Sequence, residues 1–288
     1  MGDFYGHATG TIANGQVRLV YLATAGPRIV GLFREGSERN LLAETPELGW
    51  ETPAGTLRLY GGHRLWVAPE VPAYTYVPDN EGVVVTALAD GVSLCRPAEG
   101  AAGIGKTLEI HLHPDEAVVS LLHHLDNEGE QTVEIAPWAI TQLPLGGTAF
   151  LPQPMEPVDA DGLRPNRQLA LWPYSDWEDP RFRPGNELIL VDGQPRERAF
   201  KLGTFIRHGW AGYLYADGTL LAKTFAVEPE RRYPDLNSNV EVYVWDRFLE
   251  LETLGPLTRL EPGQRVSHRE EWRLHSDVPP ATIAAFAP

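Results

Sequence analysis

The sequence predicts an all-β protein, and three observations support this prediction. Short apolar runs recur along the whole chain and are separated by turns rich in Gly, Pro and Asp. Within many of these runs apolar and polar residues alternate, which is the pattern of half-buried strands. No stretch of about a dozen residues has the periodicity of an amphipathic helix. We therefore expect antiparallel sheets connected by turns.

The predicted strands can be followed in order along the chain. The first two are separated by a Gly-Pro turn, which is typical of a meander. In the N-terminal half, strands are predicted at 17–22, 28–33, 56–60, 82–88, 106–112, 117–122 and 132–138. In the C-terminal half, they are predicted at 187–191, 199–203, 212–216, 219–225, 239–245, 248–254 and 269–274.

Between about 151 and 187 the chain is rich in Pro, Asp, Arg and Trp and has no strand pattern. We interpret this segment as a long irregular loop, because strands resume directly after it. Loops of this length are often functional. Since the strand pattern continues beyond this loop at regular spacing, we expect one domain that spans residues 1–288.

Composition and charge exclude several functions. The chain has 288 residues, of which 43% are hydrophobic, and its net charge of −15 comes from 39 acidic and 24 basic residues. Without a block of Lys or Arg, a nucleic-acid partner is not expected. The N-terminus does not resemble a signal peptide, and no apolar segment is long enough to cross a membrane. We expect a soluble, cytoplasmic protein, and the oligomeric state stays open.

Two predicted strands carry pairs of acidic and aromatic residues. Successive side chains of a strand point to opposite faces, so Glu250 and Glu252 share one face of the strand at 248–254. In the strand at 239–245, Glu241, Tyr243 and Trp245 share a face and three valines form the other. If these strands are neighbours, acids and aromatic rings line one surface. That surface is either a solvated sheet face or the floor of a polar cleft.

Residues 100–107 match the phosphate-binding pattern GxxxxGK[ST]. That motif requires a helix that begins at the lysine, so that backbone amides face the phosphates. Here Lys106 is followed by the alternating residues of a predicted strand. We therefore reject a phosphate-binding loop, and we expect no cofactor.

Four histidines in predicted strands are candidate metal ligands. His111 and His113 share one face of a predicted strand, whereas His123 and His124 fall on opposite faces. No third ligand follows at a recognisable spacing. We therefore expect solvated strand histidines and no metal site.

Residues 60–70 contain the densest group of chemically active side chains in the first half. Two glycines allow a close backbone turn, and His63, Arg64, Trp66 and Glu70 follow. These residues are either part of a site or structural, with Arg64 paired to Glu70 and Trp66 in the core.

Three of the eight tryptophans lie in or near polar, acid-rich stretches, namely Trp172, Trp177 and Trp245. An aromatic ring can stack on the apolar face of a sugar while carboxylates accept hydrogen bonds from its hydroxyls. A surface of this kind suits a neutral polyol.

Three segments of the chain resemble a known superfamily. They are YGGHRLWVAPE, the pair NVEVYVWD and LELETLGPL, and EPGQRVSHREEW. They resemble uncharacterised bacterial proteins of the galactose mutarotase-like superfamily, and the resemblance covers nearly the whole chain. It implies a β-supersandwich, in which two large antiparallel sheets pack together and a sugar-binding cleft lies on the concave face of one.

The resemblance also implies roles for individual residues. Aldose 1-epimerases of this superfamily use a C-terminal Glu as the general base, and Glu252 matches its context. They use an Arg that follows an early glycine-rich strand, for which Arg64 is the candidate. The general acid of these enzymes is a His, and in this sequence Trp138 occupies its position. An indole cannot donate a proton to a ring oxygen. His63, beside Arg64, and His124 are the imidazoles that could replace it.

We therefore predict a carbohydrate-binding protein. Its cleft is expected to contain His63, Arg64, Glu70, Trp138, Lys201, Lys223, Glu241 and Glu252. The glutamates 241 and 252 would accept hydroxyl hydrogen bonds, the arginine and lysines would donate, and the indole would stack.

Two alternatives to this prediction stay open. The first is an aldose 1-epimerase, in which Glu252 is the base and His63 the acid. The second is a structural or protein-interaction module that uses its acidic face. Lys201 and Lys223 are compatible with an anionic group on the ligand, but strand lysines also protect sheet edges from aggregation. Whether the sugar is phosphorylated or acidic therefore stays open.

Overall fold

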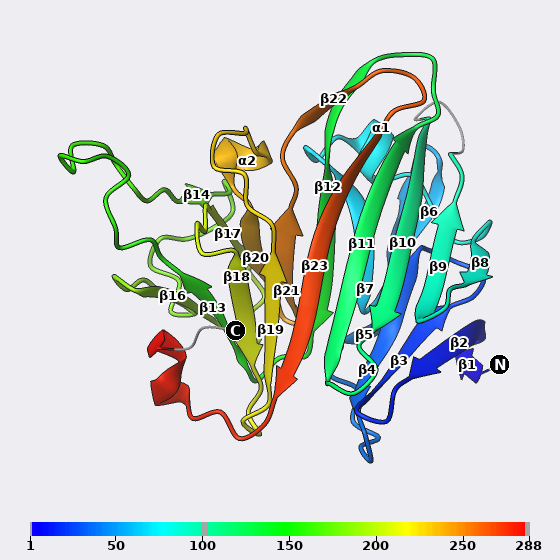
Figure 1. Ribbon diagram of the computed structural model, residues 1–288, viewed down its shortest axis with the longest axis horizontal. Coiled ribbons are helices and arrows are strands. Elements are labelled where there is room, and N and C mark those ends of the chain that lie inside the picture. The colour runs from blue at the N-terminus through cyan, green and yellow to red at the C-terminus, as the bar shows by residue number, and fades with distance from the viewer. Residues whose placement is uncertain (1, 99–102, 286–288) are drawn as a thin grey trace.

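The computed structural model describes residues 2–98 and 103–285. Two large antiparallel sheets pack face to face (Figure 1). The first sheet has eleven strands, and β22 (Thr258–Leu260) pairs with β12 at its side. The other ten follow the order β1 (Gly2–Phe4), β2 (His7–Ala13), β3 (Val17–Leu22), β4 (Arg28–Arg34), β7 (His63–Ala68), β12 (Val133–Leu143), β21 (Leu249–Leu254), β20 (Val240–Val244), β17 (Phe200–Thr204) and β14 (Ala170–Leu171).

The second sheet has ten strands and faces the first. Its order is β15 (Phe182–Arg183), β16 (Leu188–Asp192), β13 (Thr148–Pro152), β18 (Trp210–Leu214), β19 (Leu220–Phe225), β23 (Arg265–His275), β11 (Val118–Asn127), β10 (Ile104–Leu112), β9 (Gly91–Arg96) and β8 (Val84–Ala87). A separate hairpin consists of β5 (Glu44–Thr52) and β6 (Gly55–Gly61).

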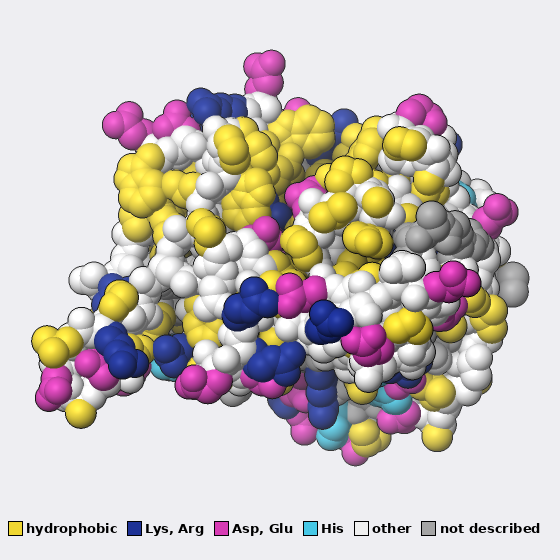
Figure 2. Space-filling model, turned by 90° about the horizontal axis from the view of Figure 1, so that it is seen from above, with side chains coloured by type: hydrophobic (Ala, Val, Ile, Leu, Met, Phe, Trp, Pro, Cys, Tyr) yellow, Lys and Arg dark blue, Asp and Glu magenta, His cyan; other side chains and the backbone are white. Residues whose placement is uncertain are grey.

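Helices are short in the described part of the chain. They are α1 (Pro72–Thr75), α2 (Pro234–Asn237) and a 3₁₀ segment at Pro280–Ala285. Among the described residues, no helix combines the length and the apolar character needed to cross a membrane. Figure 2 shows the molecule from one end, where hydrophobic side chains gather beside acidic and basic ones.

The main hydrophobic core lies between the two sheets, and strands β20 and β21 show why. Val240, Val242 and Val244 alternate with polar residues, and all three are fully buried in this core. Leu249 and Leu251 of β21 join them on the same face. Because successive side chains alternate, the acidic and aromatic residues of these strands point to the outer face of the eleven-stranded sheet.

The all-β prediction and the β-supersandwich are confirmed. Every stretch that was predicted as a strand contains one, and the segment 153–187 is irregular apart from two two-residue strands, β14 and β15. Strand β7 was not predicted as a strand. All six of its side chains are buried, so it lacks the alternation that identifies a half-exposed strand.

The rejection of a phosphate-binding loop agrees with the structure. Lys106 lies within β10, and no helix begins there. The preceding residues 99–102 lie outside the described part of the chain. His111, on the same strand, is half-buried and bonds to the carboxylate of Asp90 at 2.8 Å.

Two glycines orient strand β7, as the sequence suggested. Gly61 and Gly62 have φ values of 95° and 66°, which other residues adopt only with strain. A Cβ at Gly62 would also clash with the backbone oxygen of Ile29. This turn leads from the β5–β6 hairpin into β7 and fixes the directions of His63 and Arg64.

Candidate functional site

A pocket of about 250 Å³ lies on the outer face of the eleven-stranded sheet. Its floor comes from β7, β12, β17, β20 and β21, and its walls come from the β5–β6 hairpin, the α1 region and the long loop 153–187. Eight of its lining residues are aromatic: Trp50, Trp66, Tyr76, Trp138, Tyr174, Tyr243, Trp245 and Phe248. Four are charged, namely Arg64, Glu70, Lys201 and Glu250.

A buried ammonium holds two carboxylates at the floor of the pocket. Lys201 Nζ lies 2.7 Å from Glu241 Oε2 and 3.1 Å from Glu252 Oε2. The ammonium also lies over the rings of Trp138 and Trp172, at 4.5 and 4.6 Å from their centroids. Both glutamates are fully buried and face each other across neighbouring strands. We refer to Lys201, Glu241 and Glu252 as the floor cluster.

Burial and charge set the protonation of the floor cluster. Burial raises the pKa of Glu241 well above its ordinary value and also raises the pKa of Glu252. Burial alone would lower the pKa of Lys201, but the two carboxylates outweigh it and hold that pKa well above the ordinary value. The lysine is therefore charged, and the two carboxyls as a pair hold a proton to a higher pH than ordinary carboxyls do.

The indole of Trp138 closes the floor over Glu252. Its Nε1 donates a hydrogen bond of 2.7 Å to Glu252 Oε2, the oxygen that also accepts from Lys201. Trp138 is only 2% exposed, and Glu252 has no exposed surface. In this structure the carboxylate of Glu252 therefore lies beneath the pocket and does not line it.

A second buried ion pair lies beside the floor cluster. Arg64 Nη2 donates to Glu250 Oε1 at 2.8 Å, and Gln142 Nε2 donates to the same oxygen at 2.9 Å. The guanidinium stacks on the ring of Trp66, with 4.2 Å between Cζ and the ring centroid. Arg64 Nε and Nη1 are buried and have no hydrogen-bond partner among the described residues. Like the carboxylate of Glu252, these two nitrogens lie beneath the accessible surface of the pocket.

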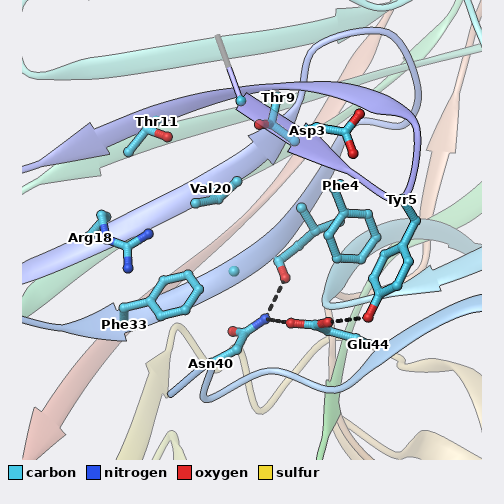
Figure 3. A pocket seen from close by; sticks show the side chains of 13 residues that line it. Asp3, Phe4, Tyr5, Thr9, Thr11, Arg18, Val20, Phe33, Asn40 and Glu44 are labelled. Carbon is cyan, nitrogen blue, oxygen red and sulfur yellow. Dashed lines mark hydrogen bonds between the residues drawn. The ribbon is translucent and has the colours of Figure 1, made fainter. Parts of the chain in front are cut away.

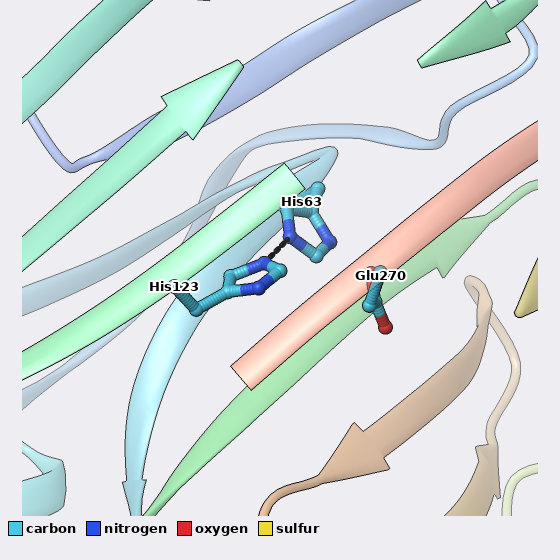
Figure 4. Close-up of side chains that lie close together, drawn as sticks. All are labelled: His63, His123 and Glu270. Carbon is cyan, nitrogen blue, oxygen red and sulfur yellow. Dashed lines mark hydrogen bonds between the residues drawn. The ribbon is translucent and has the colours of Figure 1, made fainter. Parts of the chain in front are cut away.

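His63 and Lys223 do not lie in this pocket, which corrects the expectation that they do. His63 precedes Arg64 in β7 and so points to the other face, toward the core between the sheets. There its Nε2 lies 2.7 Å from Nε2 of His123 (Figure 4). Lys223 belongs to the second sheet and reaches the same inner space, where it pairs with Glu270 at 2.8 Å.

These residues form a buried hydrogen-bonded chain. His123 Nδ1 donates to the backbone oxygen of His268, so His123 Nε2 is the acceptor for the N–H of His63. His63 Nδ1 then accepts from the hydroxyl of Thr141, which itself accepts from Lys223. Burial lowers the pKa of His63 well below its ordinary value and that of His123 to about 4, so both imidazoles are neutral.

His63, His123 and Glu270 lie close enough together to bind one metal ion. However, the ammonium of Lys223 already neutralises Glu270, and the indole of Trp272 donates to its other oxygen at 2.9 Å. A metal ion would have to enter beside this ammonium, which is unfavourable. We therefore interpret the group as a polar network that connects the two sheets.

The structure also shows the partner of Arg64 and the positions of Trp66 and His124. Arg64 pairs with Glu250 and not with Glu70, whose Oε1 accepts from the hydroxyl of Tyr76. Trp66 is buried, as the structural interpretation required. His124 belongs to the second sheet and bonds to Ser267, so it is not near the pocket.

Four of the expected cleft residues line the pocket: Arg64, Glu70, Trp138 and Lys201. Glu241 and Glu252 lie beneath it. Of the tryptophans singled out in polar stretches, Trp245 lines the pocket, Trp172 covers Lys201, and Trp177 is 63% exposed outside it. Trp50, Tyr76 and Tyr174 were missed, because they come from the hairpin and loops, whose position over the sheet has no local signal in the sequence.

A second hollow of about 410 Å³ lies near the N-terminus, over strands β1 to β4 (Figure 3). Its carboxylates, Asp3 and Glu44, are exposed. Glu44 already accepts from Tyr5 and Asn40, at 2.8 and 2.9 Å. Because this hollow has no buried carboxylate among its described residues, we place the candidate site in the aromatic pocket.

Comparisons with known proteins agree with this fold. No family model and no curated protein matches the sequence. A protein of Escherichia coli K12 described as a candidate aldose 1-epimerase has a similar structure, with a TM-score of 0.58, 13% identity and coverage of 94% of this chain and 100% of that one. A galactose mutarotase-like protein of Lactobacillus casei has a TM-score of 0.53 and 11% identity over 93% of this chain and 100% of its own.

A third solved structure is larger. It is a TPR-domain containing protein of Parabacteroides distasonis, with a TM-score of 0.65 and 15% identity, and the match covers 98% of this chain and 49% of that one. The chain thus spans about half of that protein. Identities this low establish the fold alone, and on that basis the chain has the galactose mutarotase-like fold.

Proposed function

We propose that this protein binds a carbohydrate in the aromatic pocket on the outer face of the eleven-stranded sheet. The lining of the pocket carries this proposal. Aromatic rings offer flat faces for the C–H groups of a sugar, and a few fixed polar groups among them can orient its hydroxyls. The structural neighbours are named as a candidate aldose 1-epimerase and a galactose mutarotase-like protein, which is consistent with a sugar-related role.

The polar groups of the pocket are suited to hydroxyl ligands. Glu70 and Glu250 line the pocket, and in each carboxylate only one oxygen accepts a hydrogen bond from the described residues. The other oxygen of each carboxylate can accept a hydrogen bond from a sugar hydroxyl. An interaction module would need no such pocket, since its side chains could fill the space of about 250 Å³.

Replacing Trp50 by alanine tests the stacking surface. Trp50 lines the pocket and is 39% exposed, so its loss should leave the fold intact. We expect the affinity for a bound sugar to fall about tenfold, since an aromatic contact contributes on the order of 1 kcal/mol. Isothermal titration or NMR titration with a panel of mono- and oligosaccharides measures the change.

Trp177→Ala is the matched control for this experiment. Trp177 is also an exposed tryptophan, but it does not line the pocket. We expect its replacement to leave sugar affinity unchanged. Equal effects of the two replacements would place the binding surface elsewhere, and no binding of any sugar would remove the main support for the proposal.

Aldose 1-epimerase activity is the second candidate, and Glu252 is the observation that bears on it. A general base must reach the hydroxyl whose proton it removes. Glu252 stands where the resemblance places that base, but Trp138 and Lys201 cover it and it has no exposed surface. Neither His63 nor His124 faces the pocket. The geometry therefore favours binding over epimerisation.

We accordingly expect no acceleration of mutarotation. With wild type and with Glu252→Gln, the α and β anomers of freshly dissolved aldoses should interconvert at the rate found in buffer alone. Polarimetry or NMR measures this rate. An accelerated rate that disappears in Glu252→Gln would instead identify an epimerase whose floor opens on binding. An accelerated rate that persists in the variant would exclude Glu252 as the base.

A further inference from the structure

The charges of the aromatic pocket point to a more specific class of ligand, on the condition that the proposed carbohydrate binding is correct. Both cations near the pocket are already neutralised. Arg64 pairs with Glu250, and Lys201 lies between Glu241 and Glu252. No free positive charge therefore remains among the described lining residues to attract an anionic sugar.

Negative charge, by contrast, faces the pocket. Oε1 of Glu250 accepts from both Arg64 and Gln142, while Oε2 has no hydrogen-bond partner in the described part of the chain. Glu70 stands at the exposed rim, where only its Oε1 accepts, from the hydroxyl of Tyr76. Each carboxylate thus offers a free oxygen, and their combined charge exceeds that of Arg64.

The site also shows how it accommodates an ammonium group. The ammonium of Lys201 is held by two carboxylates and by the ring faces of Trp138 and Trp172. Aromatic faces attract cations because of the negative potential above the ring. The lining of the pocket contains the same two kinds of group, namely aromatic rings and the carboxylates of Glu70 and Glu250.

We propose that the pocket selects sugars that carry a free ammonium group, with this group bound by Glu70 and Glu250 against the aromatic lining. A charge-assisted hydrogen bond to a carboxylate is stronger than a neutral one. The amine is thereby the feature that distinguishes the preferred ligand from a neutral hexose.

Four hexose derivatives of similar size test this selectivity. Glucosamine carries the ammonium, glucose lacks it, N-acetylglucosamine replaces it by a neutral amide, and glucuronate carries a carboxylate. In titrations at neutral pH and low salt, we expect glucosamine to bind about tenfold more tightly than glucose, as one charge-assisted hydrogen bond would give. N-acetylglucosamine and glucuronate should bind no more tightly than glucose.

Two variants assign the selectivity to the carboxylates. Glu70→Gln and Glu250→Gln should each reduce the preference for glucosamine over glucose at least threefold, while glucose affinity changes less. Glu70 is exposed, so its variant should fold even if Glu250→Gln, which also removes the partner of Arg64, does not. Glu130→Gln removes the same charge from an exposed position outside the lining and should leave the preference unchanged.

The possible results separate the two proposals. Equal binding of glucosamine and glucose, or tighter binding of glucuronate, would overturn the ammonium selectivity and leave carbohydrate binding intact. A glucosamine preference that persists in both glutamine variants would also overturn it. If none of the four sugars nor any of the broader panel binds, carbohydrate binding itself fails, and the selectivity fails with it.

Discussion

Replacing Lys201 by methionine should destabilise the protein at neutral pH by about 3–5 kcal/mol, as the loss of one partner of a buried ion pair does. The variant removes the only ammonium that the described residues place between the fully buried Glu241 and Glu252. Methionine keeps most of the volume and can pack against the rings of Trp138 and Trp172. The loss would therefore come from charge and not from a cavity.

The pH dependence of this loss distinguishes it from a packing defect. Without the lysine, both buried carboxyls have pKa values above those in the unfolded chain, because burial disfavours their charged form. The folded variant then binds more protons than the unfolded one, so its stability rises as the pH falls through the raised pKa values. Urea unfolding at pH 8, 7, 6 and 5 should show the difference from wild type becoming smaller toward pH 5.

Two further variants complete the test of the floor cluster. Lys201→Met combined with Glu241→Gln should recover part of the stability at neutral pH, because one of the two buried carboxyls left without a cation is gone. Arg232→Met breaks an exposed ion pair with Glu134 and should cost less than about 1 kcal/mol. A small, pH-independent loss in Lys201→Met would contradict the view that the lysine holds two buried carboxylates.

The face of the strands at 239–245 and 248–254 that carries the site could be predicted from the sequence alone. Alternation placed Glu241 with Tyr243 on one strand and Glu250 with Glu252 on the other, with a common surface only if the strands are neighbours. The structure makes them neighbours and pairs Glu241 with Glu252 and Tyr243 with Glu250. Whether this side is solvated could not be predicted. It is decided by the β5–β6 hairpin and the loop 153–187, which cover it, and nothing in the strands themselves encodes that cover.

Partners of charged residues were the least predictable feature. Arg64 and Glu70 are close in sequence, yet Arg64 binds Glu250, which lies 186 positions away. In an antiparallel sheet, neighbouring strands bring distant segments together, so the register and not the sequence separation decides the contact. His63 was assigned to the cleft only because it precedes Arg64, although the same alternation rule places adjacent residues on opposite faces.

Acidification should weaken the fold through the buried histidines. His63, His123 and His268 lie in the network between the sheets, and burial lowers the pKa of all three, to about 4 for His123 and about 3 for His268. In the unfolded chain these imidazoles titrate near 6.5. Below that pH the unfolded state binds protons that the folded state does not, so the free energy of unfolding decreases as the pH falls from 6.5 toward 4.

The size of this effect can be measured through one residue. For His123, a pKa of about 4 in the folded state against 6.5 in the unfolded state corresponds to about 3 kcal/mol, accumulated across that pH range. His123→Gln removes this titration, because an amide does not ionise in this pH range. We expect a lower stability at pH 7.5 than in wild type, and a shallower decline between pH 6.5 and 4.5.

The comparison of variants is necessary because other buried groups titrate with the opposite sign. The raised pKa values of Glu241 and Glu252 add stability as the pH falls. The lowered pKa of Glu270 removes stability, but only once the pH falls to the range in which an ordinary carboxyl titrates. Wild type and His123→Gln share these groups, so the difference between their urea-unfolding curves isolates the imidazole.

His208→Gln, at a histidine that is 43% exposed, should follow the wild-type profile. If His123→Gln follows it as well, the imidazole of His123 does not stay neutral in the folded protein, and the directed chain from Lys223 to the backbone of His268 is wrong.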